Sequence, residues 1–363
     1  MKLSPLSLVF ISGLLTACGS TNNIERIAGA DTITPLHKEG QREGRYHNLY
    51  PGKKTYPNNC ESECYPSDPH LQCKEENEHC LYIGEQTIPT LNTGFTVRWL
   101  GHAGFMINTP NGQHVIIDPV KEQFDSPVDL AFRLVSGFYR QPGDWLTKSE
   151  LENLDAVIYS HLHYDHFNKA DIEEIGNKPR YLTPLGMGDN FPDGGFNISE
   201  MAWFAKTNID DLTIHSLPAH HFSSRVLVPF IYEDNDKDLW NGWLLEQNGK
   251  TLFFAGDTGY SKHFSDIQQR YDDIDVCLIP IASYYHEENA NWYRYVHTTP
   301  EDALTAAQDL NCKVMIPWGY GNASWKMGDH TSHSALLRLL HMYDEMDSQT
   351  PLYILNEGES VAL

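Results

Sequence analysis

The chain has 363 residues, of which 40% are hydrophobic and 21% charged, so it can bury a sizeable core. This composition excludes disordered, collagenous and polytopic membrane proteins. The formal net charge of −23 makes nucleic acid an unlikely partner, because an acidic surface repels phosphate backbones. We therefore expect no nucleic acid among the partners. The 18 histidines raise the question of a metal site, because neutral imidazole is the commonest metal ligand in proteins.

The first twenty residues have the pattern of an export signal. Lys2 gives a positive start, and the apolar run 6–15 is too short to span a bilayer. The tetrapeptide LTAC at 15–18 resembles a bacterial lipobox, in which the cysteine becomes the lipidated first residue of the mature chain. This resemblance implies a lipoprotein signal peptide over 1–17, a membrane anchor through lipidated Cys18, and a place in the bacterial cell envelope, at the outer membrane facing the periplasm. A plain signal peptide and an N-terminal anchor are the alternatives.

The remaining cysteines fall into two sets, and an envelope location permits disulfides. Four lie in one short polar stretch: Cys60, Cys64, Cys73 and Cys80. We expect two disulfides among them, in any of three connectivities. A structural zinc site is the alternative, which the lack of C-x2-C pairs disfavours. Cys277 and Cys312 each lie in an apolar run, and there we expect buried free thiols, with a bridge between adjacent strands as the alternative.

Residues 18–90 are polar and turn-rich, so we expect a linker followed by a cysteine-rich extension that packs on the main body. From 91 to 363 the chain alternates short apolar runs with turns. Strands are predicted within 95–108, 111–119, 155–160, 180–184, 211–219, 225–233, 241–247, 250–257, 275–281, 313–318 and 351–355. Helices are predicted over 169–176, 260–271, 300–310 and 334–346. Two strand-rich halves with interspersed helices predict an α/β fold in which sheet packs on sheet, with the helices outside.

The sharpest motif is SHLHYDH at 160–166, directly after a strand that is predicted to be buried. In an extended segment His161 and His163 project to the same side and could hold one metal ion. Asp165 and His166 follow at the next turn and could serve a second ion. Imidazole and carboxylate ligands suit zinc, iron or manganese, so this pattern predicts a metal centre.

Two further strand ends carry metal-ligating groups. His220 and His221 end one predicted strand, and Asp257 ends another between two glycines. Ligands at strand ends are held by rigid elements, which a metal site needs. A carboxylate at Asp257 could bridge two ions, although the same residue would also suit a simple turn.

Together these motifs resemble the metallo-β-lactamase superfamily and, more narrowly, the N-acylphosphatidylethanolamine-hydrolysing phospholipase D family. The resemblance runs from about residue 40 to the C-terminus, apart from the insert 60–80. Besides SHLHYDH, its motifs are RYHN at 45–48, WLGHA at 99–103, PAHH at 218–221 with Arg225, FFAGDTGY at 253–260, the stretch 279–303 and NEGES at 356–360. It implies two mixed sheets packed face to face with helices outside, and a metallo-β-lactamase-like hydrolase domain over 91–363.

The resemblance also implies the roles of the site residues. The implied ligands are His161, His163 and His221 for one ion, Asp165 and His166 for the other, and Asp257 as the bridge. The implied cofactor is zinc, as one or two ions per chain, with iron or manganese as alternatives. Asp165, Asp257 and His297 are the implied catalytic residues, with His297 near the substrate phosphate. Asp118 and His102 are expected to orient ligand imidazoles, unless they are ordinary polar residues of strand turns.

One position departs from the family. The family has a last histidine for the second ion just before Trp-Gly, where this chain has Pro317. Proline cannot ligate through its side chain, so the second ion lacks a donor unless water or another histidine replaces it. The candidate histidines are His286, His297, His330 and His333. The loss also fits a chain that has given up the family's reaction.

The leading hypothesis is an envelope-anchored hydrolase, a phosphodiesterase of phospholipase D type that cleaves N-acylphosphatidylethanolamine-like phospholipids through a metal-bound hydroxide. The alternatives are a hydrolase of a lactone or other ester, and a non-catalytic lipoprotein that binds metal or lipid. The net charge argues against binding anionic bilayers by charge alone. Aromatic residues that could instead line an acyl groove are Trp203, Phe204, Phe222, Tyr284, Tyr285, Trp292 and Tyr293. For each of them, a place in the core or on the surface is the alternative.

Overall fold

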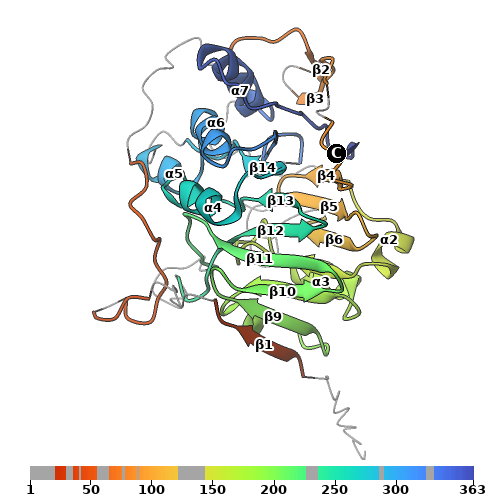
Figure 1. The fold of residues 1–363 in the computed structure, drawn as a ribbon, viewed down its shortest axis with the longest axis vertical. Helices are drawn as coiled ribbons and strands as arrows, with labels where there is room; N and C mark the ends of the chain where they lie inside the picture. The colour runs from red at the N-terminus through yellow and green to blue at the C-terminus, as the bar shows by residue number, and fades with distance from the viewer. Residues whose placement is uncertain are drawn as a thin grey trace, which may run out of the picture.

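Two sheets of mixed direction form the body of this computed structural model (Figure 1). The structure describes residues 21–29, 36–40, 42–54, 65–75, 78–87, 90–121, 144–225, 236–285, 290–323 and 331–363. The eight-stranded sheet runs in the order β1 (Asn23–Ile27), β9 (Asn197–Met201), β8 (Arg180–Pro184), β7 (Ala156–Ile158), β6 (His114–Ile117), β5 (Gly104–Asn108), β4 (Thr96–Gly101) and β16 (Ser360–Ala362). The six-stranded sheet runs β10 (Lys206–Ile209), β11 (Leu212–Pro218), β12 (Asn241–Gln247), β13 (Lys250–Phe254), β14 (Val276–Pro280) and β15 (Val314–Trp318).

Parallel and antiparallel pairs occur in both sheets. Strands β6, β7, β8, β9 and β1 are parallel, whereas β4, β5, β6 and β16 pair antiparallel. Strands β10 to β13 are antiparallel, and β13, β14 and β15 are parallel. The helices are α2 (Lys148–Glu152), α3 (Lys169–Ile175), α4 (His263–Tyr271), α5 (Ala290–Val296), α6 (Pro300–Asp309) and α7 (Ser334–Glu345). In Figure 1, α4, α5, α6 and α7 gather on one side of the sheets, and α2 lies on the opposite side.

The inner faces of the two sheets meet in one aromatic and aliphatic core. Phe105 of β5 lies 6.0 Å from the ring of Phe254 of β13 and 6.4 Å from Trp318 of β15. Phe254 and Trp318 stack at 5.1 Å. All three side chains are buried, so the sheets pack face to face as the sequence predicts. The predicted α/β sandwich is therefore confirmed.

Strand β7 shows why a short apolar run can position a site. Its residues Ala156 and Ile158 join the core between the sheets, whereas Val157 faces a second apolar cluster that includes Ile172 of α3. Parallel neighbours β6 and β8 hydrogen-bond it on both sides. A strand fixed on both faces and both edges holds the segment that follows it in one place.

Three sequence expectations need correction or completion. Residues 18–90 are not only linker and extension, because Asn23–Ile27 forms β1 at the edge of the large sheet. Only Ile24 and Ile27 are apolar in this strand, so its sequence pattern is weak. The strand predicted at 351–355 makes a single bridge between Leu352 and Met315, and the last strand is β16. The strand predicted at 225–233 lies almost entirely outside the described residues.

The disulfides differ from expectation at one of two places. Cys73 and Cys80 are bonded across the hairpin of β2 (Leu71–Glu75) and β3 (Glu78–Tyr82), as one of the predicted pairings requires. That bond also excludes a four-cysteine zinc site; Cys60 and Cys64 lie outside the described residues. Cys277 of β14 and Cys312 are bonded, so the prediction of free thiols is wrong and the alternative bridge is correct.

The predicted signal peptide 1–17 and lipidated Cys18 lie outside the described residues. Within the described ranges, the structure contains no helix of the length and apolar character needed to cross a bilayer.

Candidate metal centre

The end of β7 and the loops after β11 and β13 meet at one edge of the sandwich. The backbone N–H of Ser160, which begins the SHLHYDH segment, donates to Asp118 Oδ1 at 2.7 Å. The carbonyl of Ser160 accepts from the N–H of Asn241 at 2.8 Å, which ties this segment to the other sheet. The His220 carbonyl accepts from Gly259 N–H at 2.8 Å, so the loops after β11 and β13 are tied as well. These bonds bring residues far apart in sequence to one site.

The first histidine group consists of His161, His163 and His221. Their ligand atoms all lie within 4.8 Å of one another. His161 Nε2 lies 2.8 Å from His163 Nδ1, and His221 Nε2 lies 3.2 Å from that same Nδ1. The two alternating histidines therefore point to one centre, as their spacing predicts, and His221 approaches from the opposite sheet.

The second, mixed group combines carboxylates with imidazoles and consists of His102, Asp165, His166 and Asp257. His166 Nε2 lies 3.2 Å from Asp257 Oδ2 and 3.7 Å from Asp165 Oδ2. His102 Nε2 lies 2.9 Å from Asp165 Oδ2. His102, Asp165 and His166 form one set of atoms within 4.8 Å, and His161, His166 and Asp257 form another. Asp257 therefore shares ligand sets with His161 and His221 of the first group as well as with His166, as a bridging carboxylate would.

The outer ring nitrogens of three imidazoles are engaged by neighbours. His166 Nδ1 lies 2.8 Å from Asp118 Oδ2, and His221 Nδ1 lies 2.8 Å from the carbonyl of Val296. His161 Nδ1 lies 2.9 Å from the hydroxyl of Ser160. Such contacts fix the ring orientation of metal-ligating histidines. The donor set therefore fits a divalent metal ion, with the inner nitrogens turned to the centre.

The charges of the site fit a cation as well. Burial opposes a charge on His166, but Asp257 and Asp165 raise the pKa of its imidazole well above the usual value. Burial likewise opposes ionisation of Asp257, yet the neighbouring His166 and His297 hold its pKa well below the usual value. Buried carboxylates that stay ionised need a positive partner, which a divalent ion would supply.

The first group has the opposite electrostatics. Burial lowers the pKa of His163 to about 4. Burial and the surrounding imidazoles also hold the pKa values of His161 and His221 well below the usual value. These rings are therefore neutral at pH 7, and the neutral imidazole is the form that binds metal ions.

Pro317 lies buried in β15, in register with Ile279 of β14, and belongs to none of the potential ligand sets. Of the histidines that could replace the missing donor, His297 reaches the centre: its Nε2 lies 3.4 Å from Asp257 Oδ2. His333 precedes α7, with its ring 5.7 Å from Tyr320, and joins no ligand set among the described residues. His286 and His330 lie outside the described residues.

Three further residues near the centre, Asp118, His102 and His220, were singled out from the sequence, and the structure gives each a different surrounding. Asp118 contacts the His166 imidazole, as expected of an orienting residue. His102 was expected to orient an imidazole; its Nε2 contacts the Asp165 carboxylate at 2.9 Å, and its ring lies 5.4 Å from that of His166. His220 lies next to His221 in sequence, yet its ring packs 4.5 Å from Tyr295 and joins no ligand set in the described part of the chain.

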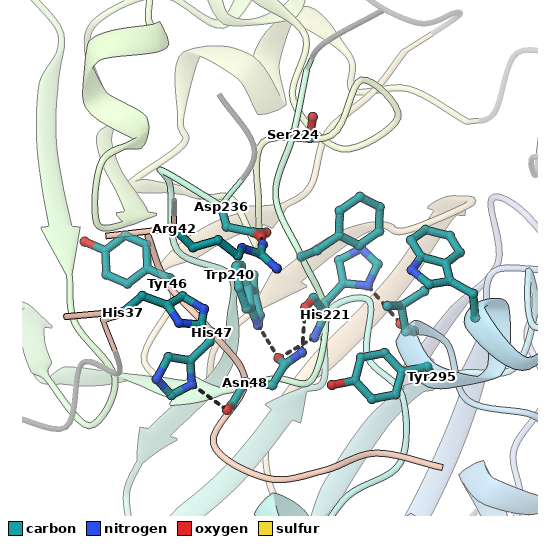
Figure 2. A pocket seen from close by; sticks show the side chains of 13 residues that line it. His37, Arg42, Tyr46, His47, Asn48, His221, Ser224, Asp236, Trp240 and Tyr295 are labelled. Carbon is teal, nitrogen blue, oxygen red and sulfur yellow. Dashed lines mark hydrogen bonds and ion pairs between the residues drawn. The ribbon is translucent and has the colours of Figure 1, made fainter. Parts of the chain in front are cut away.

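A cavity of about 590 Å³ adjoins His221 (Figure 2). One wall comes from the N-terminal segment, where the rings of His37 and His47 lie 4.7 Å apart and Arg42 pairs with Asp236. The opposite wall is aromatic and includes Phe222, Trp292 and Tyr295. Figure 2 shows the labelled side chains of both walls around His221. The N-terminal wall was given no place at the site from the sequence, although the RYHN motif at 45–48 supplies three of its residues.

The aromatic residues suggested for an acyl groove divide into two sets. Phe222 and Trp292 line this cavity, with their rings 5.0 Å apart, and Trp292 is 44% exposed. The others do not line it: Trp203 and Tyr284 are buried in the core, Phe204 lines a separate cavity, Tyr285 packs at the margin of the core, and the ring of Tyr293 lies 6.2 Å from His297.

Comparison with known proteins places this chain in a family. A model of the beta-lactamase superfamily domain matches residues 113–320. An uncharacterized protein of Mycobacterium tuberculosis is 30% identical over 252 residues, which cover 67% of this chain and 63% of that protein. N-acyl-phosphatidylethanolamine-hydrolyzing phospholipase D 1 of Caenorhabditis elegans is 27% identical over 62% of this chain and 64% of its own length.

These curated relatives extend beyond the region they share with this chain, which spans less than two thirds of their length. The solved structure of isothiocyanate hydrolase from Delia radicum gut bacteria covers 74% of this chain and 98% of that one, with a TM-score of 0.54 and 18% identity. The last likeness shows the fold alone. The family match spans more than half of the residues and includes the SHLHYDH segment and Asp257. The chain belongs to the beta-lactamase superfamily.

Proposed function

We propose that the chain is a metal-dependent hydrolase, specifically a phosphodiesterase of phospholipase D type that acts on N-acylphosphatidylethanolamine-like phospholipids. The observation that carries this proposal is the convergence of two ligand groups beside an open cavity. The inner nitrogens of His161, His166 and His221 face the centre while their outer nitrogens are engaged by neighbours. This arrangement suits a metal centre that substrate can reach.

In this proposal His161, His163 and His221 hold one ion, and Asp165 and His166 contribute to a second. Asp257 would supply a carboxylate to both. Zinc is the proposed metal, with iron or manganese as alternatives that accept the same ligands. When bound, such an ion supplies positive charge for a phosphate and lowers the pKa of a water from ~15.7 to ~7.

The chain's own residues orient the substrate and manage its protons. His297 is 12% exposed at its side chain, and its Nε2 lies 3.4 Å from Asp257 Oδ2. From that place its ring can donate to a phosphoryl oxygen. Asp165 and Asp257 stay ionised and can accept hydrogen bonds from the attacking water, which orients it. Attack of the water oxygen forms a new P–O bond and breaks the P–O bond to the leaving oxygen. The proton that the water gives up passes to that leaving oxygen, so the products are an alcohol and a phosphomonoester.

The cavity supports an amphiphilic substrate. Its aromatic wall, Phe222 with the partly exposed Trp292, offers apolar contact to an acyl chain. Such local contact would offset the net charge of −23, which opposes approach to anionic lipids. We propose further that lipidated Cys18 anchors the chain at the envelope membrane and keeps it at the surface of its substrate.

The test is turnover by the purified, zinc-loaded protein on vesicles that contain N-acylphosphatidylethanolamine and on bis(p-nitrophenyl) phosphate. The expected products from the lipid are an N-acylethanolamine and a phosphatidic acid, identified by mass. Asp257→Asn, which keeps the side-chain size, should abolish turnover. Absence of turnover on both substrates by fully loaded protein would refute the phosphodiesterase proposal.

Pro317 favours a second candidate, a non-catalytic lipoprotein that binds metal or lipid, because it removes one family ligand. For that candidate, Asp257→Asn would change metal content while no activity exists to lose. Activity should also be measured on a panel of lactones and carboxylic esters. Turnover there, without turnover of phosphodiesters, would identify a hydrolase of another ester bond instead of either candidate.

A further inference from the structure

The mixed group has a donor that replaces the histidine absent at Pro317. We propose that His102 is a direct ligand of the second metal ion, together with Asp165, His166 and Asp257. This inference rests on the metal centre of the proposed function and concerns how that centre is completed in this chain.

The distances place His102 in the ligand set. Its Nε2 lies 2.9 Å from Asp165 Oδ2, and its ring centroid lies 5.4 Å from that of His166. Two ligand atoms on one zinc ion, each at ~2.0–2.1 Å, lie about 3 to 3.5 Å from each other. The first group shows similar spacing, with nitrogens 2.8 and 3.2 Å apart. His102 therefore has the spacing of a ligand.

The backbone holds His102 in an unusual conformation. His102 has φ of +50° and follows Gly101 at φ of +96°, in the tight β4–β5 turn where the strand register shifts. Its carbonyl accepts from Trp99 Nε1 at 2.9 Å. A left-handed non-glycine residue is strained and persists where surrounding structure fixes it, often at functional sites. Because the residue is 5% exposed, its imidazole is held beside Asp165.

The other described candidates contact neither Asp165 nor His166 in a ligand set. His297 reaches the centre, but its ligand set is with His221 and Asp257. His333 joins no ligand set within the described ranges. His102 is thus the imidazole that the described structure groups with both Asp165 and His166.

A rival role for His102 is to donate a hydrogen bond to Asp165 and only orient it. The two roles differ in what can replace the imidazole. A ligand can be replaced by a histidine on another element that reaches the same ion, such as the family's position at 317. A side-chain amide can replace an orienting donor but not a zinc-ligating imidazole, so His102→Gln should keep two ions if His102 only orients Asp165 and one if His102 is a ligand.

The experiment counts zinc per chain by elemental analysis after dialysis against buffered zinc. Wild type should hold two ions and His102→Ala one, and the retained first ion would report an intact fold. The double variant His102→Ala/Pro317→His should regain the second ion. His297→Ala and His333→Gln, as matched histidine controls, should keep two.

Two retained ions in His102→Ala, one ion in wild type, or no recovery in the double variant would each overturn the proposal. Loss of the second ion in a control variant would overturn it as well. Because the count needs no substrate, it stands apart from the proposed function. An inactive protein with the expected counts would refute the phosphodiesterase and leave the ligand assignment intact.

Discussion

The two ligand groups of the centre are built in different ways. The first draws three imidazoles from two places, the loop after β7 and the end of β11. The mixed group draws on three places: the β4–β5 turn, the loop after β7 and the loop after β13. A group assembled from more elements can lose one donor and recruit another, as we infer for Pro317 and His102. The first group has His297 as a neighbouring imidazole, in one ligand set with His221 and Asp257.

The electrostatic contrast follows the same division. The imidazoles of the first group are kept neutral by burial, with the pKa of His163 at about 4. In the mixed group carboxylates dominate, and they raise the pKa of His166. The imidazoles of the first group are thus already in the neutral form that binds a metal ion. The mixed group contains buried, ionised carboxylates, which need a positive charge beside them.

The largest expected effect comes from breaking the first group. His163→Ala removes the nitrogen that faces both His161 and His221, so the first ion should be lost. Activity on bis(p-nitrophenyl) phosphate should fall by more than the roughly 100-fold upper limit expected for residues that only orient a ligand. Metal analysis with parallel rate measurements checks this. Retention of both ions would show that the two groups are not distinct.

The next effect concerns the disulfide beside β15, the strand that contains Pro317. The Cys277–Cys312 bond closes a segment with a sequence separation of 35 and joins β14 to the residues that lead into β15. Cys277→Ser/Cys312→Ser should lower the free energy of unfolding by about 3–4 kcal/mol through a freer unfolded chain. Urea denaturation measures this. Reduced wild type is the matched control, and a loss below about 1 kcal/mol would contradict the expectation.

A smaller change should act on the mixed group more than on the first. Asp118 contacts His166 Nδ1 directly and reaches His161 only through the Ser160 hydroxyl. Asp118→Asn should therefore weaken the second ion by roughly 10- to 100-fold and the first by less. Zinc titration with a chromophoric chelator resolves the two affinities. Ser160→Ala removes the hydroxyl that contacts His161 Nδ1, so it should weaken the first ion more than the second. Equal weakening of both ions by Asp118→Asn would argue against separate groups.

The sequence was sufficient to predict the first group and most of the fold. SHLHYDH lies within seven consecutive residues, so local geometry alone aligns His161 and His163. Strand β7 and the β5–β6 and β12–β13 hairpins follow from apolar runs and turn residues, whereas the turn that divides 95–108 into β4 and β5 was not predicted. The resemblance then distinguished His221 from His220, a choice that the residues themselves left open.

What the sequence could not predict depends on contacts between distant segments. Strand β1 has only two apolar residues and is defined by its pairing with β9. The cavity wall of His37 and His47 comes from a stretch whose polar composition resembles a linker. The position of His102 beside Asp165 depends on a tight turn with positive φ, which a residue pattern does not reveal.

The smallest expected effect tests whether depressed imidazole pKa values belong to the centre or to burial in general. His263 of α4 lies outside both groups, with Nδ1 2.7 Å from the Ser261 hydroxyl, and burial holds its pKa well below 6.5. As pH falls below 6.5, His263 binds a proton in the unfolded chain but stays unprotonated in the native protein. Stability is therefore full above that pH and declines below it by about 1.4 kcal/mol per pH unit for this group.

His263→Gln should remove that contribution and flatten the pH dependence, whatever it does to stability at pH 7. Urea denaturation of both proteins at pH 7, 6 and 5 gives the two slopes. The ligand histidines contribute equally in both proteins, so the difference between slopes belongs to residue 263. Parallel slopes would mean that native His263 takes up the proton, and that depressed imidazole pKa values are a property of the metal centre alone.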